Sequence, residues 1–243
     1  MTGKVIIQAR MGSTRLPGKV LLKLGGKPAL WHVVNRCREF KSISSVIVTT
    51  GTNPEDDAIE AYSQQIGALC FRGSENDVLA RFAATAREYP ADYYVRVTAD
   101  CPLIDPDTSS KIISNFEQAN VDYASNKIPQ SFPRGLDTEV FTAAALDRAH
   151  REASRDHERI HVTPYMYRPD TGFSNLSVTD DIDRSEWRWT LDTEEDLEFL
   201  RQIYERLGSN PIFKSQTVYE LLENEPELKF INSHVRQKRI EEG

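Results

Sequence analysis

The sequence predicts a doubly wound α/β sandwich, in which helices cover both faces of a mostly parallel sheet. Short β-rich runs alternate with helical runs along the chain, and this alternation is typical of parallel strands joined by helical crossovers. The chain has 243 residues, of which 39% are hydrophobic and 28% charged, so it is long enough to bury a large core. We therefore expect one domain over residues 1–243.

The first half of the chain supplies most of the regular elements. We expect strands at residues 5–9, 46–50, 93–98 and 121–124. Residues 28–40 place apolar side chains at helical spacing behind a proline, which the first turn of a helix tolerates. Asn53-Pro54 and Asp105-Pro106 are start signals for two further helices, and Gly67 ends the first of these.

From about residue 122 to residue 188 the pattern becomes irregular, with several prolines and a helical stretch near residues 142–153. We expect an inserted arm here that serves acceptor binding and dimer contacts. Regular structure returns with a strand at residues 187–191. A helix follows, and a capping box formed by Thr193 and Asp196 marks its start.

Charge is distributed unevenly along the chain, and this is the first indication of function. The whole chain has 30 basic and 37 acidic residues, a formal charge of −7, yet residues 1–40 contain eight basic residues and one acid. A nucleic-acid-binding protein usually spreads its positive charge over a wide face and is basic overall. The distribution favours a small anionic ligand and no nucleic-acid partner.

The sequence also predicts the cellular compartment of the protein. No apolar run approaches the roughly 18 residues of a membrane helix, and Gln8 and Arg10 interrupt the apolar run near the N-terminus. We therefore expect neither a membrane segment nor a signal peptide. Three well-separated cysteines, Cys37, Cys70 and Cys101, predict free thiols. We expect a cytoplasmic protein.

A loop rich in glycine and basic residues follows the first predicted strand. Gly12 and Gly18 allow backbone amides to approach a ligand closely, and the hydroxyls of Ser13 and Thr14 lie between them. Three cations complete the loop: Arg10, Arg15 and Lys19. A loop at the carboxyl end of a strand lies at the usual ligand crevice of an open parallel sheet, so the segment predicts a polyphosphate cradle. A solvated basic loop is the alternative.

Two well-known phosphate-binding motifs do not fit this loop. A P-loop has four residues between its glycines and Ser or Thr after its lysine. Here five residues separate Gly12 from Gly18, and Val20 follows Lys19. The dinucleotide fingerprint G-x-G-x-x-G is also absent, which weighs against a nicotinamide-dependent dehydrogenase.

Two carboxylates, Asp100 and Asp192, each follow a predicted strand. If the strands at residues 93–98 and 187–191 run parallel to the first strand, both side chains lie at the same sheet edge as the basic loop. Magnesium is usually held by one or two carboxylates together with phosphate oxygens and water. Helix capping is the alternative for either residue, since Asp192 directly precedes a predicted helix.

The segment IIQARMGSTRLPGKVLLKLGGKPAL resembles the opening signature of the sugar-acid cytidylyltransferases, which activate sugar acids as CMP-sugars. The segments RGSENDVLARF, VTADCPLI, PRGLDTEVF, HVTPYMY and WTLDTEEDL extend the resemblance over most of the chain. The most similar pattern is that of the spore coat polysaccharide biosynthesis protein F branch.

The resemblance implies a Rossmann-like nucleotidyltransferase fold. It also implies that a sugar hydroxyl attacks the α-phosphorus of CTP and releases pyrophosphate, in the service of surface polysaccharide or glycan biosynthesis. A homodimer, with the arm as the contact, and the preference for cytosine are implied by the family alone.

The resemblance also implies roles for individual residues. The implied catalytic residues are Arg10, Arg15, Lys19 and Asp100. The implied nucleotide-binding residues are Ala9, Arg10, Gly12, Ser13, Arg15, Lys19, Arg72 and Asp77. Asp100 and Asp192 are implied to bind the Mg²⁺ that bridges the nucleotide phosphates. Helix capping by Ser74, with Asp77 three residues later, explains that part of the chain equally well.

Six residues between 122 and 188 are candidates for binding the acceptor: Arg134, Asp137, Glu139, His161, Tyr165 and Arg188. An acidic acceptor would pair well with the fork of a guanidinium group. Residues 157–161 also match the zinc pattern His-Glu-x-x-His. A zinc helix needs an apolar helical setting and a third ligand, however, and Pro164 ends any helix within three residues.

Two other functions remain as alternatives. A nucleotide-sugar-dependent glycosyltransferase would share the α/β architecture and the metal, but such enzymes usually carry an Asp-x-Asp pair where this chain has Asp100-Cys101-Pro102. A catalytically silent binding protein could have kept the nucleotide fold. Loss of Arg15 or Lys19 would indicate such a protein, and both are present.

Overall fold

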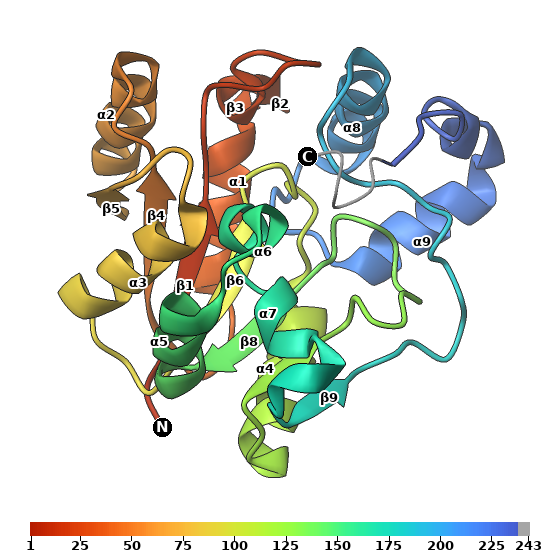
Figure 1. Cartoon of the computed structure of the whole chain (residues 1–243). Helices are drawn as coiled ribbons and strands as arrows, with labels where there is room; N and C mark the ends of the chain where they lie inside the picture. Colours follow the sequence, from red (N-terminus) through yellow and green to blue (C-terminus); the bar gives the residue numbers. More distant parts are fainter. Residues whose placement is uncertain (238–243) are drawn as a thin grey trace.

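Seven strands form the central sheet within residues 1–237, the part of the chain that the computed structural model describes (Figure 1). The strands are β1 (Gly3–Gln8), β4 (Ile43–Thr50), β5 (Leu69–Arg72), β6 (Tyr93–Thr98), β7 (Tyr123–Ser125), β8 (Glu139–Thr142) and β9 (Asn175–Ser177). Their order across the sheet is β5-β4-β1-β6-β8-β7-β9. The first four are mutually parallel, whereas β8 is antiparallel to both neighbours. The predicted mostly parallel α/β fold is confirmed.

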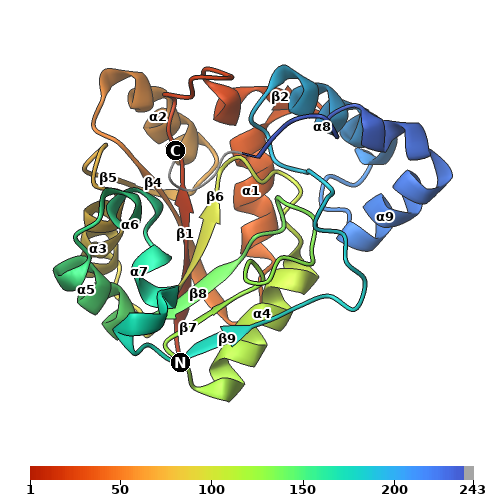
Figure 2. The same ribbon diagram turned by 45° about the vertical axis from the view of Figure 1, so that its right-hand side comes forward.

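Helices cover both faces of this sheet (Figures 1 and 2). One face is covered by α1 (Ala29–Arg38), α2 (Asp57–Gln65) and α4 (Pro106–Ala119). The other face is covered by α3 (Val78–Glu88), α5 (Ala143–Glu152), α6 (Asp156–His161) and α7 (Pro164–Tyr167). Because β1 lies in the middle, its residues Val5, Ile6 and Ile7 are fully buried on both faces.

A third group of elements packs beside the sheet. It contains α8 (Glu194–Leu207) and α9 (Ser215–Asn224), which share an apolar cluster with Leu24, Ala29 and Trp189. A hairpin of β2 (Lys23–Leu24) and β3 (Lys27–Pro28) joins this cluster to the start of α1. In the described part of the chain, no helix has both the length and the apolar character needed to cross a bilayer.

Short 3₁₀ turns complete the secondary structure: η1 (Lys19–Leu21), η2 (Pro54–Asp56), η3 (Pro169–Thr171) and η4 (Pro226–Phe230). The turn η2 is the start that Asn53-Pro54 predicted, and α2 continues it. Asp105 caps α4 by accepting from the amide of Thr108, as predicted. The capping box of Thr193 and Asp196 at the start of α8 is also confirmed.

The strand predicted at residues 187–191 is wrong. These residues form one isolated bridge, in which Arg134 and Arg188 are partners, and they join no sheet within residues 1–237. The amide of Arg134 donates to Trp187 at 2.9 Å, and the amide of Trp189 donates to Arg134 at 2.7 Å. The apolar side chains that suggested a strand, such as Trp189 and Leu191, instead face the cluster around α8.

The region predicted as an inserted arm, residues 122–188, contributes β7, β8 and β9 to the central sheet and α5, α6 and α7 to one of its faces. The irregular pattern therefore reflects very short strands, of three or four residues, between short helices. The predicted role of this region in acceptor binding and dimer contacts stays a prediction.

Candidate active site

A cavity of about 330 Å³ lies at the carboxyl ends of β1 and β6. These strands end in the same row of the sheet, where Gln8 pairs with Thr98, so the loops that follow them meet there. The residues that line the cavity are Gln8, Ala9, Arg10, Ser13, Thr14, Arg15, Lys19, Val20, Arg96, Thr98, Ala99, Asp100, His161 and Asp192. The basic loop and both predicted metal-binding aspartates thus share one cavity.

The loop after β1 is folded around the backbone carbonyl of Met11. The amides of Ser13 and Gly18 both donate to this oxygen, at 2.9 and 3.1 Å, and the carboxylate of Asp56 accepts from the Met11 amide at 2.8 Å. Gly18 has a φ of +67°, a conformation that favours glycine, and it leads Lys19 into η1. These bonds close the loop and bring Arg15 and Lys19 into the cavity wall.

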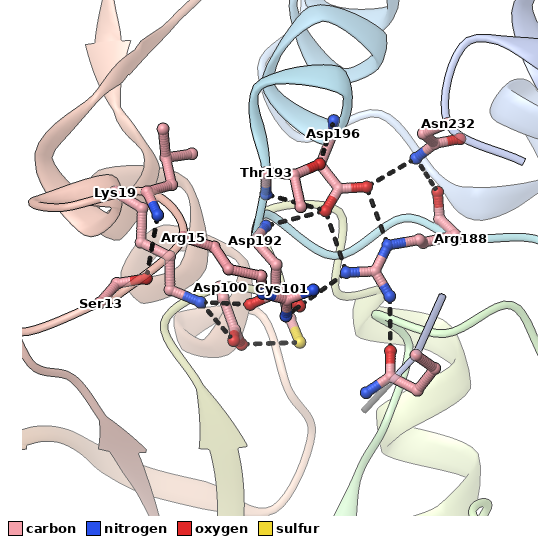
Figure 3. Close-up of polar contacts among 12 residues, drawn as sticks. Ser13, Arg15, Lys19, Asp100, Cys101, Arg188, Asp192, Thr193, Asp196 and Asn232 are labelled. Atoms are coloured by element: carbon pink, nitrogen blue, oxygen red, sulfur yellow. Dashed lines mark hydrogen bonds and ion pairs between the residues drawn. The ribbon is translucent and has the colours of Figure 1, made fainter. Parts of the chain in front are cut away.

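The ammonium group of Lys19 lies between the two aspartates (Figure 3). Lys19 Nζ is 2.9 Å from Asp100 Oδ2 and 2.6 Å from Asp192 Oδ1. Arg15 approaches from the same loop, and its Nη2 is 3.2 Å from Asp192 Oδ2. Two cations of the basic loop therefore face two carboxylates across the cavity, and the four side chains hold one another in place.

Burial and charge act in opposite directions on these groups. Burial by itself would lower the pKa of Lys19, but Asp100 and Asp192 outweigh it and raise that pKa above its ordinary value. Burial would likewise raise the pKa of Asp100, but Lys19 and a hydrogen bond from Thr98 hold it well below its usual range. Both groups are therefore charged at neutral pH.

Asp192 reaches Asp100 through backbone pairing outside the sheet. The amide of Leu191 donates to the backbone oxygen of Asp100 at 2.8 Å. Thr98 fixes the Asp100 side chain by donating to Oδ1 at 2.5 Å. Helix capping does not account for either aspartate, because Thr193 caps α8 and Asp105 caps α4.

Arg188 holds Asp192 from the side opposite Lys19 (Figure 3). Its Nη2 donates to Asp192 Oδ2 at 2.7 Å, and its Nε donates to Asp196 Oδ1 at 2.9 Å. Asn232 also donates to Asp196, at 2.9 Å. Arg188 is 5% exposed and does not line the cavity, so the structure places it behind the predicted metal ligand rather than at an acceptor position.

The donor set fits a hard divalent cation. Asp100 and Asp192 offer carboxylate oxygens that share one ammonium group, and magnesium typically takes one or two carboxylates and completes its shell with phosphate oxygens and water. Among residues 1–237 no cluster of three or more His, Cys, Asp or Glu is arranged to hold an ion. An ion bound between these two carboxylates would complete its shell with water or with phosphate oxygens.

The nucleotide-binding candidates divide into two groups. Ala9, Arg10, Ser13, Arg15 and Lys19 line the cavity, and Gly12 lies in the same loop. The structure does not bring the other two candidates to the cavity. Arg72 is held by Asp57 at 2.5 Å, and Asp77 caps α3 and is bound by Arg159.

Of the acceptor candidates, His161 alone is a lining residue of the cavity that the structure describes. Glu139 is buried and is bound to Arg96, which lines the cavity. Asp137 accepts from Gln130 at 3.2 Å. Tyr165 donates to Glu152 at 2.8 Å, and Arg134 pairs through its backbone with the segment at Trp187. Neither residue lines the cavity.

The sequence analysis missed three polar residues of the cavity floor: Gln8, Arg96 and Thr98. They point to the same face of adjacent strands, because Gln8 is in register with Thr98 and Arg96 precedes Thr98 by two residues. An arginine within the β-rich run at residues 93–98 was the available signal.

A basic loop that faces paired carboxylates at the carboxyl edge of a parallel sheet is the arrangement expected of a nucleotidyltransferase. A family model described as cytidylyltransferase matches residues 4–231. An uncharacterised protein of Methanocaldococcus jannaschii is 37% identical over 239 residues, which cover 98% of this chain and 97% of that protein. The spore coat polysaccharide biosynthesis protein SpsF of Bacillus subtilis is 33% identical over 234 residues, which cover 91% and 94%.

Two solved structures are similar to this chain. A cytidylyltransferase from Leptospira borgpetersenii superimposes with a TM-score of 0.90 at 31% identity, covering 98% of this chain and 100% of that one. A CMP:2-keto-3-deoxy-manno-octonic acid synthetase solved with CTP shares the fold, with a TM-score of 0.66 at 18% identity over 85% and 99% of the two chains. The chain belongs to the cytidylyltransferase family, and it is a nucleotidyltransferase.

Proposed function

We propose that this enzyme transfers CMP from CTP to a sugar acid and releases pyrophosphate, for the synthesis of a surface polysaccharide or glycan. The observation that carries the proposal is the pairing of Arg15 and Lys19 with Asp100 and Asp192 in one cavity. A sugar hydroxyl oxygen forms a bond to the α-phosphorus and gives up its proton to solvent water. The bond from the α-phosphorus to the bridging oxygen breaks, and pyrophosphate leaves with the electron pair.

The basic loop is suited to hold the triphosphate, which carries roughly four negative charges. Arg10, Arg15 and Lys19 would neutralise most of this charge, and the amides near Gly12 and Ser13 would add hydrogen bonds. At about 4 Å and an effective dielectric constant near 20, each charge contact is worth about 4 kcal/mol before desolvation. Positioning and neutralisation of this kind are the main demands of phosphoryl-type transfer.

Asp100 and Asp192 would hold the Mg²⁺. When bound, this ion offsets charge on the α-phosphate and activates an oxygen nucleophile. Three side chains hold the two carboxylates in position for the ion. Thr98 and Arg188 fix them by hydrogen bonds, and Lys19 keeps them close together. Lys19 would then be available to the phosphates.

The nature of the acceptor is proposed from the relatives. The Bacillus subtilis relative is named for spore coat polysaccharide biosynthesis. Matches over about half of the chain include a 3-deoxy-manno-octulosonate cytidylyltransferase from Trichlorobacter lovleyi, 39% identical over 113 residues. Only the second name specifies an acceptor, which is a sugar acid, and the proposal takes its acceptor class from this relative. A homodimer with contacts from residues 122–188 is part of the same proposal.

Pyrophosphate release tests the function directly. The purified protein is incubated with Mg²⁺, one of the four ribonucleoside triphosphates and a panel of sugar acids that includes 3-deoxy-manno-octulosonate and N-acetylneuraminate. We expect release with CTP and one of the acids, and a loss of at least about 100-fold in Asp100→Asn. Release at the wild-type rate in Asp100→Asn would overturn the metal assignment. Release with CTP and a neutral sugar, but with no acid, would overturn the acceptor class.

A further inference from the structure

A buried arginine forms part of the cavity floor at some distance from the basic loop. Arg96 lies on β6, is 8% exposed and lines the cavity together with Gln8 and His161. The residues before it on this face of β6 and β8, Tyr94 and Phe141, belong to the apolar cluster under α3, α5 and α7. The sheet face thus changes from apolar to charged at the point where the cavity begins.

Glu139 holds Arg96 in a fixed position. The two residues are directly opposite each other on the antiparallel strands β6 and β8. Arg96 Nη1 donates to Glu139 Oε2, and Arg96 Nη2 donates to Gln8 Oε1 at 2.9 Å. Glu139 Oε1 accepts from Tyr123 at 2.8 Å and from Thr163 at 2.6 Å. Its oxygens are therefore fully engaged, so Glu139 positions the arginine and is not free to bind a ligand.

Charged groups of both signs surround Arg96 beside the cavity. Lys127 Nζ is 3.4 Å from the same Glu139 carboxylate, so two cations share one buried anion. Asp137 is the other acid near Lys127, and burial raises the pKa of its carboxyl. Arg96 retains donor capacity, because Glu139 and Gln8 take two of the five N–H groups of its guanidinium. Its Nε is itself buried and has no hydrogen-bond partner among the described residues.

Stability alone does not explain this arrangement. A buried ion pair usually contributes no more than apolar residues of the same volume, because both charges lose their hydration. A guanidinium group held rigidly at a cavity wall is, however, a good partner for a carboxylate, since its N–H groups match the two oxygens. Arg96 is two residues from Thr98, roughly 6.5 Å along the strand, and Thr98 holds Asp100.

We propose that Arg96 binds the carboxylate of the acceptor and that Glu139 positions it for this purpose. The acceptor hydroxyl would then face the α-phosphate near Asp100, and its acid group would lie deeper, against Arg96. This inference rests on the proposed function and makes it more specific: Arg96 is the residue that selects an acid over a neutral sugar.

Comparison of an acid with its ester tests the inference. The wild-type protein, Arg96→Met and Arg96→Lys are assayed for pyrophosphate release at saturating CTP, with the sugar acid that the wild type uses and with its methyl ester. We expect Arg96→Met to raise the KM for the acid by about 30-fold or more, with the KM for CTP changed less than about 3-fold. The preference for acid over ester should disappear in this variant. Arg96→Lys, which keeps the charge and loses the fork, should keep part of it.

The controls separate this inference from the proposed function. Arg148→Met removes an arginine that pairs with Glu152 at 3.1 Å on α5, away from the cavity, and should keep the full preference for the acid. An unchanged ratio of acid to ester in Arg96→Met would overturn the assignment of Arg96 and leave the proposed function standing. Failure of the proposed function itself would be seen in the wild type, as the absence of release with every sugar acid. If Arg96→Met does not fold, an unchanged ratio in Arg96→Lys would overturn the assignment.

Discussion

Lys19 is the residue on which both acids of the site converge. Asp100 and Asp192 accept from the same ammonium group, at 2.9 and 2.6 Å, and each would repel the other without it. Lys19 is only 9% exposed, and its burial is tolerated because both neighbours are anions. The same geometry that positions the proposed metal ligands therefore also stabilises the fold around them.

Replacement of Lys19 by methionine should expose this dependence. We expect Lys19→Met to lower the free energy of unfolding by about 2–4 kcal/mol at pH 7, because two partly buried carboxylates lose their shared cation. Millimolar Mg²⁺ should restore more stability in this variant than it adds to the wild type, since the ion no longer competes with an ammonium group. Urea unfolding with and without Mg²⁺ measures both effects.

The exposed Lys23 provides the control, since Lys23→Met should leave stability and the response to Mg²⁺ unchanged. An equal increment from Mg²⁺ in the wild type and in Lys19→Met would show that the ion binds somewhere other than between the two aspartates.

At the scale of elements, the segment that carries Asp192 depends on one glycine. Residues 187–191 are held by backbone bonds to Arg134 and Asp100, and Gly135 follows Arg134 directly. Gly135 has a φ of +104°, and a Cβ added there would lie 2.7 Å from the backbone carbon and oxygen of Trp189. The close approach of these two chains is therefore possible only without a side chain at residue 135.

We expect Gly135→Ala to push this segment away and to displace Asp192. Stability should fall by about 2–4 kcal/mol, of which about 1 kcal/mol comes from the backbone conformation and the rest from the clash. Gly26→Ala separates the two effects, because Gly26 has a φ of +84° and nothing within 4 Å of an added Cβ. Thermal unfolding in the presence and absence of CTP and Mg²⁺ is the measurement. Equal losses in the two variants would contradict the role given to this contact.

Local signals in the sequence predicted the elements that depend on local physics. The buried run of β1, the capping Asp105 and the capping box at Thr193 each need only neighbouring residues, and all three are confirmed. The prediction of a strand at residues 187–191 was wrong because an alternation of apolar side chains indicates only which face of a segment is buried. It does not show whether another strand is available as a partner.

The same distinction applies to the site. The cations of the basic loop are contiguous in sequence, and the structure brings them to one cavity. Arg96 was missed because its meaning depends on Glu139, 43 residues away on a strand that is only four residues long. Arg72 and Asp77 stand in a segment that resembles nucleotide-binding sequences, yet both are engaged by neighbouring side chains away from the cavity.

At the scale of the whole molecule, the uneven charge of the sequence becomes a pairing in space. Residues 1–40 carry eight basic residues and one acid, and the fold sets Arg15 and Lys19 of this segment against Asp100 and Asp192. A second charged group, centred on Glu139 of β8, joins this strand to β6, β7 and the start of α7 through Arg96, Tyr123 and Thr163. The first group is anchored by two partly buried carboxylates and the second by a buried one, so the stability of the whole fold should depend on pH in the acid range.

Glu139 determines the sign of this dependence. Burial by itself would raise the pKa of Glu139, but Lys127, Arg96 and two hydrogen bonds lower it to about 2. The unfolded chain, in which a glutamate has a pKa of about 4.3, therefore takes up the proton first as the pH falls. The stabilisation is fully present above about pH 5 and is lost as the pH falls towards 2. This difference in pKa corresponds to about 3 kcal/mol of folding free energy.

We expect Glu139→Gln to have a free energy of unfolding about that much lower than the wild type at pH 7. The difference between the two proteins should narrow below pH 4, and urea unfolding across this range measures it. Asp100 contributes with the same sign in both proteins and cancels in the comparison. The control is Glu223→Gln, at an exposed position of α9, which should match the stability of the wild type at every pH. A stability difference between Glu139→Gln and the wild type that stays constant down to pH 3 would show that the Glu139 carboxylate is not held by its cations.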